Sequence, residues 1–142
     1  MESAREDLRV AVSSTRDVVT ARREARTLAR SLGFEGSQVT LIAAAISEVG
    51  RNIVEFARHG EIVLGCIGNG SKCGIQIVAR DQGPGIANLA KAMQYGYSTR
   101  HRVGAGLPGA KWLMDEFEIQ SNMGKGTTIT MKKWVEQSSQ IE

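Results

Sequence analysis

Hydrophobic and polar residues along the first part of the chain alternate with the period of a strand and then with that of a helix. Apolar side chains at every second position of residues 8–14 predict a half-buried strand. From there to residue 32 the apolar positions recur at helical spacing. Ser14 or Thr15 is suited to cap this helix, and Gly33 to end it. The pattern therefore predicts a strand followed by a long amphipathic helix.

A second, longer helix is predicted from a cap at Ser37 to about residue 58, where Gly60 would terminate it. Its apolar side chains again fall on one side of a helix. The residues predicted to be buried on this side are Val39, Ile42, Ala43, Ile46, Val49, Ile53 and Phe56.

The remaining sequence is dominated by short β-rich runs separated by glycines. Residues 61–67 and 72–80 predict a hairpin around Gly68-Asn69-Gly70-Ser71, and residues 116–121 and 127–134 predict a second strand pair. Between the two pairs we expect a short helix at 88–95, an exposed loop at 97–103 and a helix at 107–115. This order predicts one α+β domain over residues 1–142, with its core at 8–134 and a polar tail at 135–142. A largely antiparallel sheet would carry the helices on one face.

Composition and charge exclude several classes of function. The longest apolar run is residues 41–46, far short of the roughly 20 residues that a membrane-spanning helix needs. The first residues are polar and do not resemble a signal peptide, so we expect a cytoplasmic protein without a membrane partner. The net charge of +3 is interspersed and aromatics are 5%, which argues against nucleic-acid binding. Cys66 and Cys73 are expected to be free thiols.

The sixteen glycines of the chain are not evenly spread. Three clusters, DQGPG, VGAGLPG and NMGKGT, follow one another between residues 81 and 127. Glycine is favoured where the backbone turns sharply or approaches a ligand closely. The clusters therefore point to a binding site.

Glu48 and Asn52 lie one helical turn apart on the second predicted helix, beside its buried side. A carboxylate and an amide at this spacing suit a divalent metal, or a general base beside a metal. An ordinary hydrogen bond on the helix surface explains the same pair.

Asp81 is the first residue of the first glycine cluster, where its carboxylate is suited to accept a hydrogen bond from an exocyclic amine. A plain turn is the alternative.

The second glycine cluster immediately precedes a predicted helix, which is the geometry of an anion site. The unpaired N–H groups of the first helical turn and its positive end favour phosphate. Polar and basic residues just before the cluster would add donors, although a solvated loop explains them equally well. At the third cluster, Thr127 is suited to complete a pocket for a ring, or is simply a residue that favours strands.

Together the segments ISEVGRNIVEFA, DQGPGI, GAGLPGAKWLMD and GKGTTI resemble the GHKL ATP-binding family in order and spacing. The resemblance spans about residues 8–134 and implies a two-layer sandwich of the Bergerat type that binds ATP and Mg²⁺. It implies that Glu48 is the general base, that Asn52 binds Mg²⁺ and the nucleotide, and that Asp81 binds the adenine amine. The other residues that it assigns to nucleotide binding are Gly83, Gly85, Ser98, Thr99, Arg100, Gly104, Ala105, Gly106, Leu107 and Thr127.

Within that family the sequences of these segments are most similar to those of the small bacterial serine/threonine kinases of the anti-sigma-factor type, especially the stressosome switch kinases. This resemblance implies a kinase that phosphorylates STAS-domain scaffold proteins, is released by that reaction, and then activates a PP2C-type phosphatase. Two alternatives stay open. One is an anti-sigma factor kinase that sequesters a sigma factor, and the other is a nucleotide-binding interaction module without turnover. Arg100-His101-Arg102 stands where relatives tend to have small residues.

Overall fold

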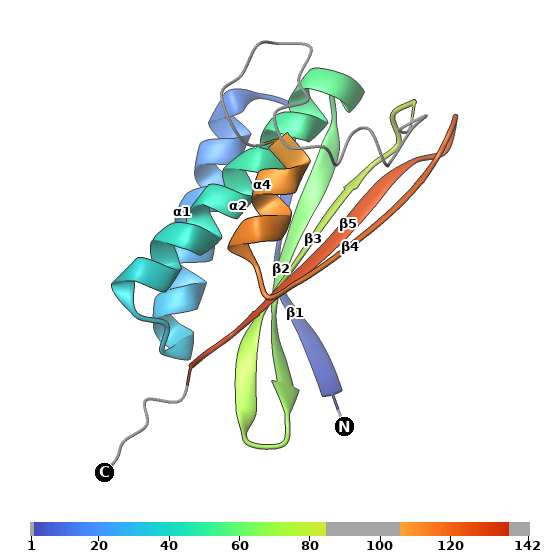
Figure 1. The fold of residues 1–142 in the computed structure, drawn as a ribbon. Helices are drawn as coiled ribbons and strands as arrows, with labels where there is room; N and C mark the ends of the chain where they lie inside the picture. Colours follow the sequence, from blue (N-terminus) through green and yellow to red (C-terminus); the bar gives the residue numbers. More distant parts are fainter. Residues whose placement is uncertain (1, 85–105, 137–142) are drawn as a thin grey trace.

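The computed structural model describes residues 2–84 and 106–136 (Figure 1). In chain order the elements are β1 (Glu2–Val12), α1 (Thr15–Leu32), α2 (Gly36–Asn52), the π-helical turn η1 (Ile53–Ala57), β2 (Gly60–Asn69), β3 (Lys72–Asp81), α4 (Gly106–Leu113), β4 (Glu116–Asn122) and β5 (Gly126–Trp134). The helix predicted at 88–95 and the loop predicted at 97–103 lie outside the described residues.

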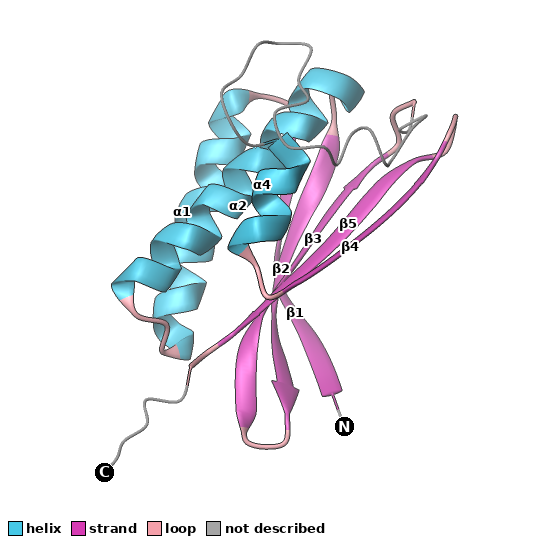
Figure 2. Ribbon diagram, in the orientation of Figure 1, coloured by secondary structure: helices cyan, strands magenta, loops and turns pink. Residues whose placement is uncertain are grey.

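The strands form one five-stranded sheet in the order β1-β2-β3-β5-β4, and every neighbouring pair is antiparallel. The helices lie together on one side of this sheet (Figure 2). The prediction of an α+β fold with a largely antiparallel sheet and helices on one face is confirmed. No helix in the described ranges is long and apolar enough to cross a membrane.

α1 forms where the sequence predicts it because both of its ends are capped. Ser14 is the N-cap, and its hydroxyl accepts a hydrogen bond from the backbone N–H of Asp17. Gly33 takes the left-handed conformation at φ 99° and ends the helix. Its buried stripe consists of Val18, Ala21, Ala25 and Ala29, and three alanines in that stripe let α2 approach closely.

α2 differs from its prediction at both ends. Ser37 is not the cap: the helix begins at Gly36 after Glu35, which makes no capping hydrogen bond through its side chain. The regular helix ends at Asn52 and not at residue 58, because η1 adds one residue to the turn and the N–H of Arg58 donates to the carbonyl of Ile53. This turn rotates Phe56 out of the predicted buried stripe, and it is 51% exposed.

β1 is longer than the predicted strand of residues 8–14. It begins at Glu2, pairs with β2 along its whole length, and contains an irregularity between Glu6 and Leu8. Side chains of residues 2–9 are exposed, so the first half of β1 lacks the alternation of burial by which a strand is predicted. The other four predicted strands agree closely with β2, β3, β4 and β5.

The core lies between the sheet and the helices. Its largest fully buried side chains are Ile42, Ile46, Ile53, Ile62, Leu64, Ile75, Ile77, Ile129, Met131, Val12 and Val49. The sheet face away from the helices carries charges instead. There Glu61 of β2 accepts hydrogen bonds from Arg9 and Arg80 on the two flanking strands. The bond from Arg9 lowers the pKa of Glu61, while partial burial opposes the shift.

Cys66 and Cys73 are free thiols. The Cys66 thiol donates a hydrogen bond to the carboxylate of Asp7, at 2.9 Å. Burial raises the pKa of this thiol, and the hydrogen bond to Asp7 raises it further. Cys66 therefore remains protonated at neutral pH and acts as a hydrogen-bond donor.

Candidate active site

The predicted base and metal ligand lie at the C-terminal end of α2. Glu48 and Asn52 are one turn apart in continuous helix, and the residues that follow them, Val49 and Ile53, are buried in the core. The core therefore fixes the orientation of this face. The Glu48 side chain is 16% exposed, and its Oε1 lies 3.2 Å from Nη1 of Arg51. Sequence reasoning did not identify this ion pair, although the spacing of three residues favours it.

Gly50, inside the same turn, is required by close packing between the two long helices. A Cβ at this position would lie 2.8 and 2.9 Å from the two methyl groups of Val18 on α1. A mid-helix glycine costs about 1 kcal/mol relative to alanine in an exposed helix. Here it lets α2 lie directly against α1, which explains a residue that helix propensity alone disfavours.

The predicted adenine-binding residues lie at one end of the sheet. Asp81 is the last residue of β3, and Thr127 near the start of β5 is its direct partner in the strand register. Both face the helices. Gly83 follows Asp81, and its N–H donates to Asp81 Oδ1 at 2.9 Å, which holds the carboxylate at the start of the turn.

Glycines at this end of the sheet permit contacts that a side chain would block. A Cβ on Gly83 would lie 2.6 Å from the Cβ of Ala57 in η1, and one on Gly126 would lie 2.1 Å from the carbonyl oxygen of Asp81. Gly126 also has φ 94°, which L side chains rarely adopt. The strand end, the π turn and the following hairpin are thus drawn together around Asp81.

The β4–β5 hairpin closes this end through its own hydrogen bonds. The N–H of Gly124 donates to the carbonyl of Pro84 at 2.8 Å. Thr127 is a buried residue, 5% exposed. Its hydroxyl lies 2.8 Å from the hydroxyl of Ser121, and the Ser121 hydroxyl donates a hydrogen bond to the carbonyl of Gly126. Sequence reasoning missed Ser121, yet the hairpin register that places it opposite Thr127 follows from the turn at 122–126.

α4 carries the predicted phosphate-binding end. Gly106 begins the helix at φ 56°, and Leu107 is buried. At the other end, the buried ammonium of Lys133 donates to the carbonyl of Leu113 at 3.0 Å and lies 3.7 Å from Asp115. A cation at a helix C-terminus is favourable, so Lys133 anchors α4 on the sheet. The predicted residues that lie outside the described part of the chain are Gly85, Ser98, Thr99, Arg100, Gly104 and Ala105.

The side chains of the candidate site are of a chemical type that fits Mg²⁺ and ATP, the predicted bound groups. Glu48 and Asn52 present oxygen atoms, which Mg²⁺ prefers, on one helix face. Within residues 2–84 and 106–136 there is no cluster of three acidic, His or Cys side chains. The described side chains would thus supply few ligands, as is usual where Mg²⁺ is held largely by phosphate oxygens and water. Gly83 and Gly126 pack against Ala57 and the Asp81 backbone, so they fix the turn that carries the Asp81 carboxylate.

A family model described as the histidine kinase-like ATPase domain matches residues 6–133. The chain belongs to this family of ATPase domains. Membership in the histidine kinase-like ATPase family implies ATP binding, and it confirms the predicted resemblance to the GHKL group.

Two curated relatives place the chain within the histidine kinase-like ATPase family. It is 45% identical over 119 residues to Serine/threonine-protein kinase RsbT of Bacillus subtilis (strain 168), which covers 84% of this chain and 90% of the relative. It is 33% identical over 104 residues to Anti-sigma F factor of Thermoanaerobacter sp. (strain X514), covering 69% and 71%. These names agree with the predicted resemblance to small bacterial serine/threonine kinases of the anti-sigma-factor type.

A solved structure shares the fold. The RsbU and RsbW domains of a Mycobacterium tuberculosis protein match with a TM-score of 0.59 and 20% sequence identity. The match covers 96% of this chain and 35% of the length of that one. At this identity the similarity shows the shared fold, which agrees with the antiparallel sheet and one-sided helices described above.

Proposed function

We propose that this chain is an ATP-dependent serine/threonine protein kinase that phosphorylates STAS-domain scaffold proteins of a stressosome-type signalling module. Once released from the scaffold, it activates a PP2C-type phosphatase. The observation that carries this proposal is the 45% identity to the RsbT kinase across 90% of its length. The pairing of Asp81 with Thr127, and of Glu48 with Asn52 on one helix face, supports it.

In the proposed reaction each part of the site has a separate task. Asp81 accepts a hydrogen bond from the adenine amine, and Gly83 and Thr127 shape the pocket for the base. Asn52 would hold Mg²⁺, which would supply positive charge against the phosphates. Glu48 accepts the proton of the substrate hydroxyl as the phosphoryl group is transferred. Phosphoryl transfer needs mainly positioning and charge stabilisation, and these groups contribute to both and supply a proton acceptor.

Phosphate transfer tests the proposal directly. Purified protein is incubated with γ-labelled ATP, Mg²⁺ and a STAS-domain protein from a stressosome-type module. Label is expected on Ser or Thr of the STAS-domain protein. If no label is transferred although the kinase is folded and binds ATP, the proposed activity is wrong.

A second candidate is an anti-sigma factor that also has kinase activity. The identity to Anti-sigma F factor over 69% of this chain favours it. Pull-down with a sigma factor and with a PP2C-type phosphatase separates the two roles. The main proposal expects capture of the phosphatase and not of the sigma factor. A nucleotide-binding module without turnover would bind ATP but leave the STAS-domain protein unlabelled.

A further inference from the structure

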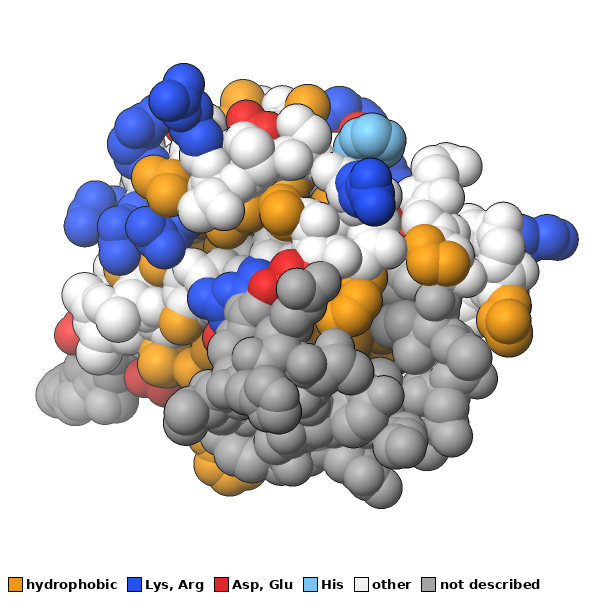
Figure 3. Space-filling model, turned by 90° about the horizontal axis from the view of Figure 1, so that it is seen from above, with side chains coloured by type: hydrophobic (Ala, Val, Ile, Leu, Met, Phe, Trp, Pro, Cys, Tyr) orange, Lys and Arg blue, Asp and Glu red, His pale blue; other side chains and the backbone are white. Residues whose placement is uncertain are grey.

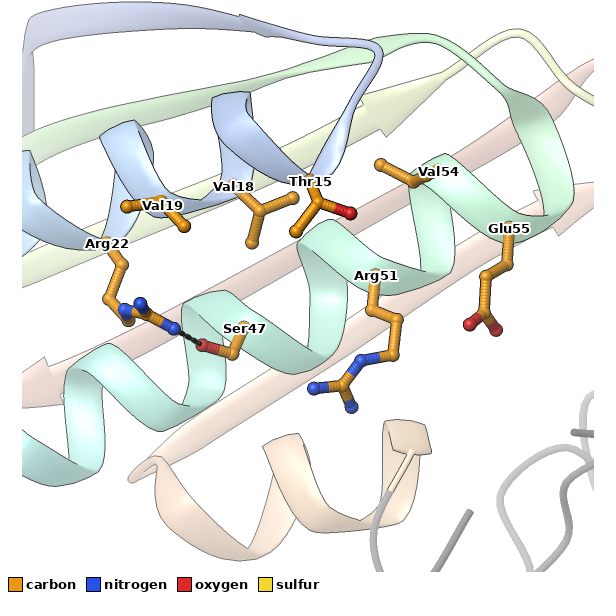
Figure 4. A pocket seen from close by; sticks show the side chains of 8 residues that line it. All are labelled: Thr15, Val18, Val19, Arg22, Ser47, Arg51, Val54 and Glu55. Atoms are coloured by element: carbon orange, nitrogen blue, oxygen red, sulfur yellow. Dashed lines mark hydrogen bonds between the residues drawn. The ribbon is translucent and has the colours of Figure 1, made fainter. Parts of the chain in front are cut away.

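A groove of about 210 Å³ lies between α1 and the α2–η1 segment (Figure 4). Both helices contribute to it. The residues that line it are Thr15, Val18, Val19, Arg22, Ser47, Arg51, Val54 and Glu55. Three valines give it an apolar floor, and Val19 is 41% exposed.

Two arginines, Arg22 and Arg51, line the groove. Arg22 donates to the hydroxyl of Ser47 at 3.1 Å, so its guanidinium is held across the groove (Figure 4). α1 as a whole carries five arginines against Asp17 and Glu24. Viewed from above, Lys and Arg side chains gather on the side where α1 lies (Figure 3). Glu55 is the one acidic residue among those that line the groove.

Arg51 connects this groove to the proposed base. It lines the groove, and its guanidinium lies 3.2 Å from the carboxylate of Glu48, which is three residues earlier on α2. Arg51 is 38% exposed on its side chain, so a docked molecule has access to it. While the ion pair is intact, one oxygen of Glu48 is engaged by a cation. That oxygen is then not open to a substrate hydroxyl, so the ion pair restricts Glu48 as a proton acceptor.

We propose that the groove docks an acidic segment of the protein substrate, and that this segment takes Arg51 away from Glu48. The proposal rests on the kinase function proposed above. Positive charge around an apolar floor fits a segment that combines carboxylates with an aliphatic side chain. One ion pair replaces another, so the exchange is close to balanced in free energy, and docking supplies the difference.

The freed carboxylate then takes part in transfer. The bond between the γ-phosphorus and the oxygen that bridges to ADP breaks, and a bond from the substrate hydroxyl oxygen to that phosphorus forms. The hydroxyl proton passes to Glu48. Without a docked protein, Arg51 keeps Glu48 occupied and limits the attack of water on ATP. The ion pair therefore links the presence of the correct substrate to the start of the reaction.

The variant Arg51→Gln separates the two effects of this residue. We expect ATP hydrolysis in the absence of a protein substrate to rise several-fold, because Glu48 is released. We expect the KM for the STAS-domain protein to rise about tenfold, and its dependence on salt to weaken, because one docking charge is lost. Arg51→Lys keeps the charge and should restore most of the docking. Thermal melting checks that both variants are folded.

Arg23→Gln is the matched control, since Arg23 is an exposed arginine of α1 that does not line the groove. The KM and the basal ATP hydrolysis should both stay within about twofold of wild type, as expected for an exposed charge outside the groove. If Arg51→Gln leaves KM and basal hydrolysis unchanged while wild type transfers phosphate, the docking inference alone is wrong. Lower basal hydrolysis with unchanged KM, or a change of oligomeric state with unchanged KM, also overturns it. Failure of wild type to transfer phosphate would instead overturn the proposed function.

Discussion

The two halves of the candidate site are built in different ways. At the end of the sheet, Asp81 is enclosed by backbone: the turn at Gly83, the hairpin at Gly126 and the partner strand at Thr127. On α2, Glu48 is held by the side chain of Arg51 at a partly exposed surface. Backbone contacts of this kind have almost no room to adjust, whereas side chains change partners readily. We therefore infer a rigid half that binds the adenine ring and an adjustable half that controls phosphoryl transfer.

Gly126 should be the most sensitive position of the rigid half. Gly126→Ala places a Cβ 2.1 Å from the Asp81 carbonyl oxygen at a positive φ. We expect a loss of about 3 kcal/mol in the free energy of unfolding, together with weaker ATP binding. Gly124→Ala is the matched control, because its φ is also positive but no atom lies within 4 Å of the added Cβ. Its cost should be about 1 kcal/mol. Equal costs in urea unfolding would contradict the close approach.

Asp81→Asn removes the charge from the rigid half and leaves its backbone in place. The amide oxygen can still accept from the Gly83 N–H, so the stability of the fold should change little. ATP affinity should fall about 10- to 100-fold, since hydrogen bonds to charged groups contribute about 1.5–3 kcal/mol. Isothermal titration with ATP measures this. Glu118→Gln, at an exposed position of β4, is the control. Unchanged affinity for Asp81→Asn would refute the adenine assignment.

Gly50→Ala tests the packing of α2, the helix that carries Glu48, against α1. The added methyl group would meet Val18 at 2.8 Å, so α1 and α2 must move apart, at a cost of about 1–3 kcal/mol in unfolding free energy. ATP affinity should stay within about threefold, because the residues proposed to bind adenine are Asp81, Gly83 and Thr127 at the end of the sheet. Gly36→Ala, with no atom within 4 Å of its Cβ, should be neutral or stabilising. If Gly50→Ala were also stabilising, close packing would not explain this glycine.

Glu61→Gln should have the smallest effect, and only on stability. The folded pKa of Glu61 lies below its ordinary value, mainly because Arg9 hydrogen-bonds the carboxylate. A lowered carboxyl pKa stabilises the fold above the unfolded value near 4.5 and ceases to do so as pH falls through the folded value. Wild type should therefore exceed the variant by up to about 1 kcal/mol at pH 7, and this difference should disappear as the pH falls through the folded pKa. A gap that widens with acidification would contradict the assignment.

Much of the fold was predictable because its signals are local. The Ser14 cap, the apolar stripe of α1 and Gly33 define one helix of eighteen residues, and glycine turns separate the strands. The first half of β1 was not predictable, since its side chains are exposed and only backbone pairing with β2 makes it a strand. Phe56 was misplaced because a π turn has no sequence signal as clear as a cap.

The residues of the candidate site were predicted by motif, but their connections were not. Spacing placed Glu48 and Asn52 on one face, and resemblance assigned their roles. The ion pair of Glu48 with Arg51 and the contact of Ser121 with Thr127 depend on which rotamers and strand register the fold selects. The groove between α1 and α2 joins residues that are up to forty positions apart, from Thr15 to Glu55. Such contacts appear only when the helices are packed.

The central claim is that Glu48 serves transfer while the sheet end serves binding. The measurement that tests it most directly follows one variant, Glu48→Gln, for both ATP affinity and phosphate transfer to the STAS-domain protein. The account predicts ATP affinity within about threefold of wild type, and transfer reduced about 10²- to 10⁴-fold, the usual contribution of a positioned general base. Transfer at the wild-type rate, or loss of ATP binding in step with transfer, would contradict the account.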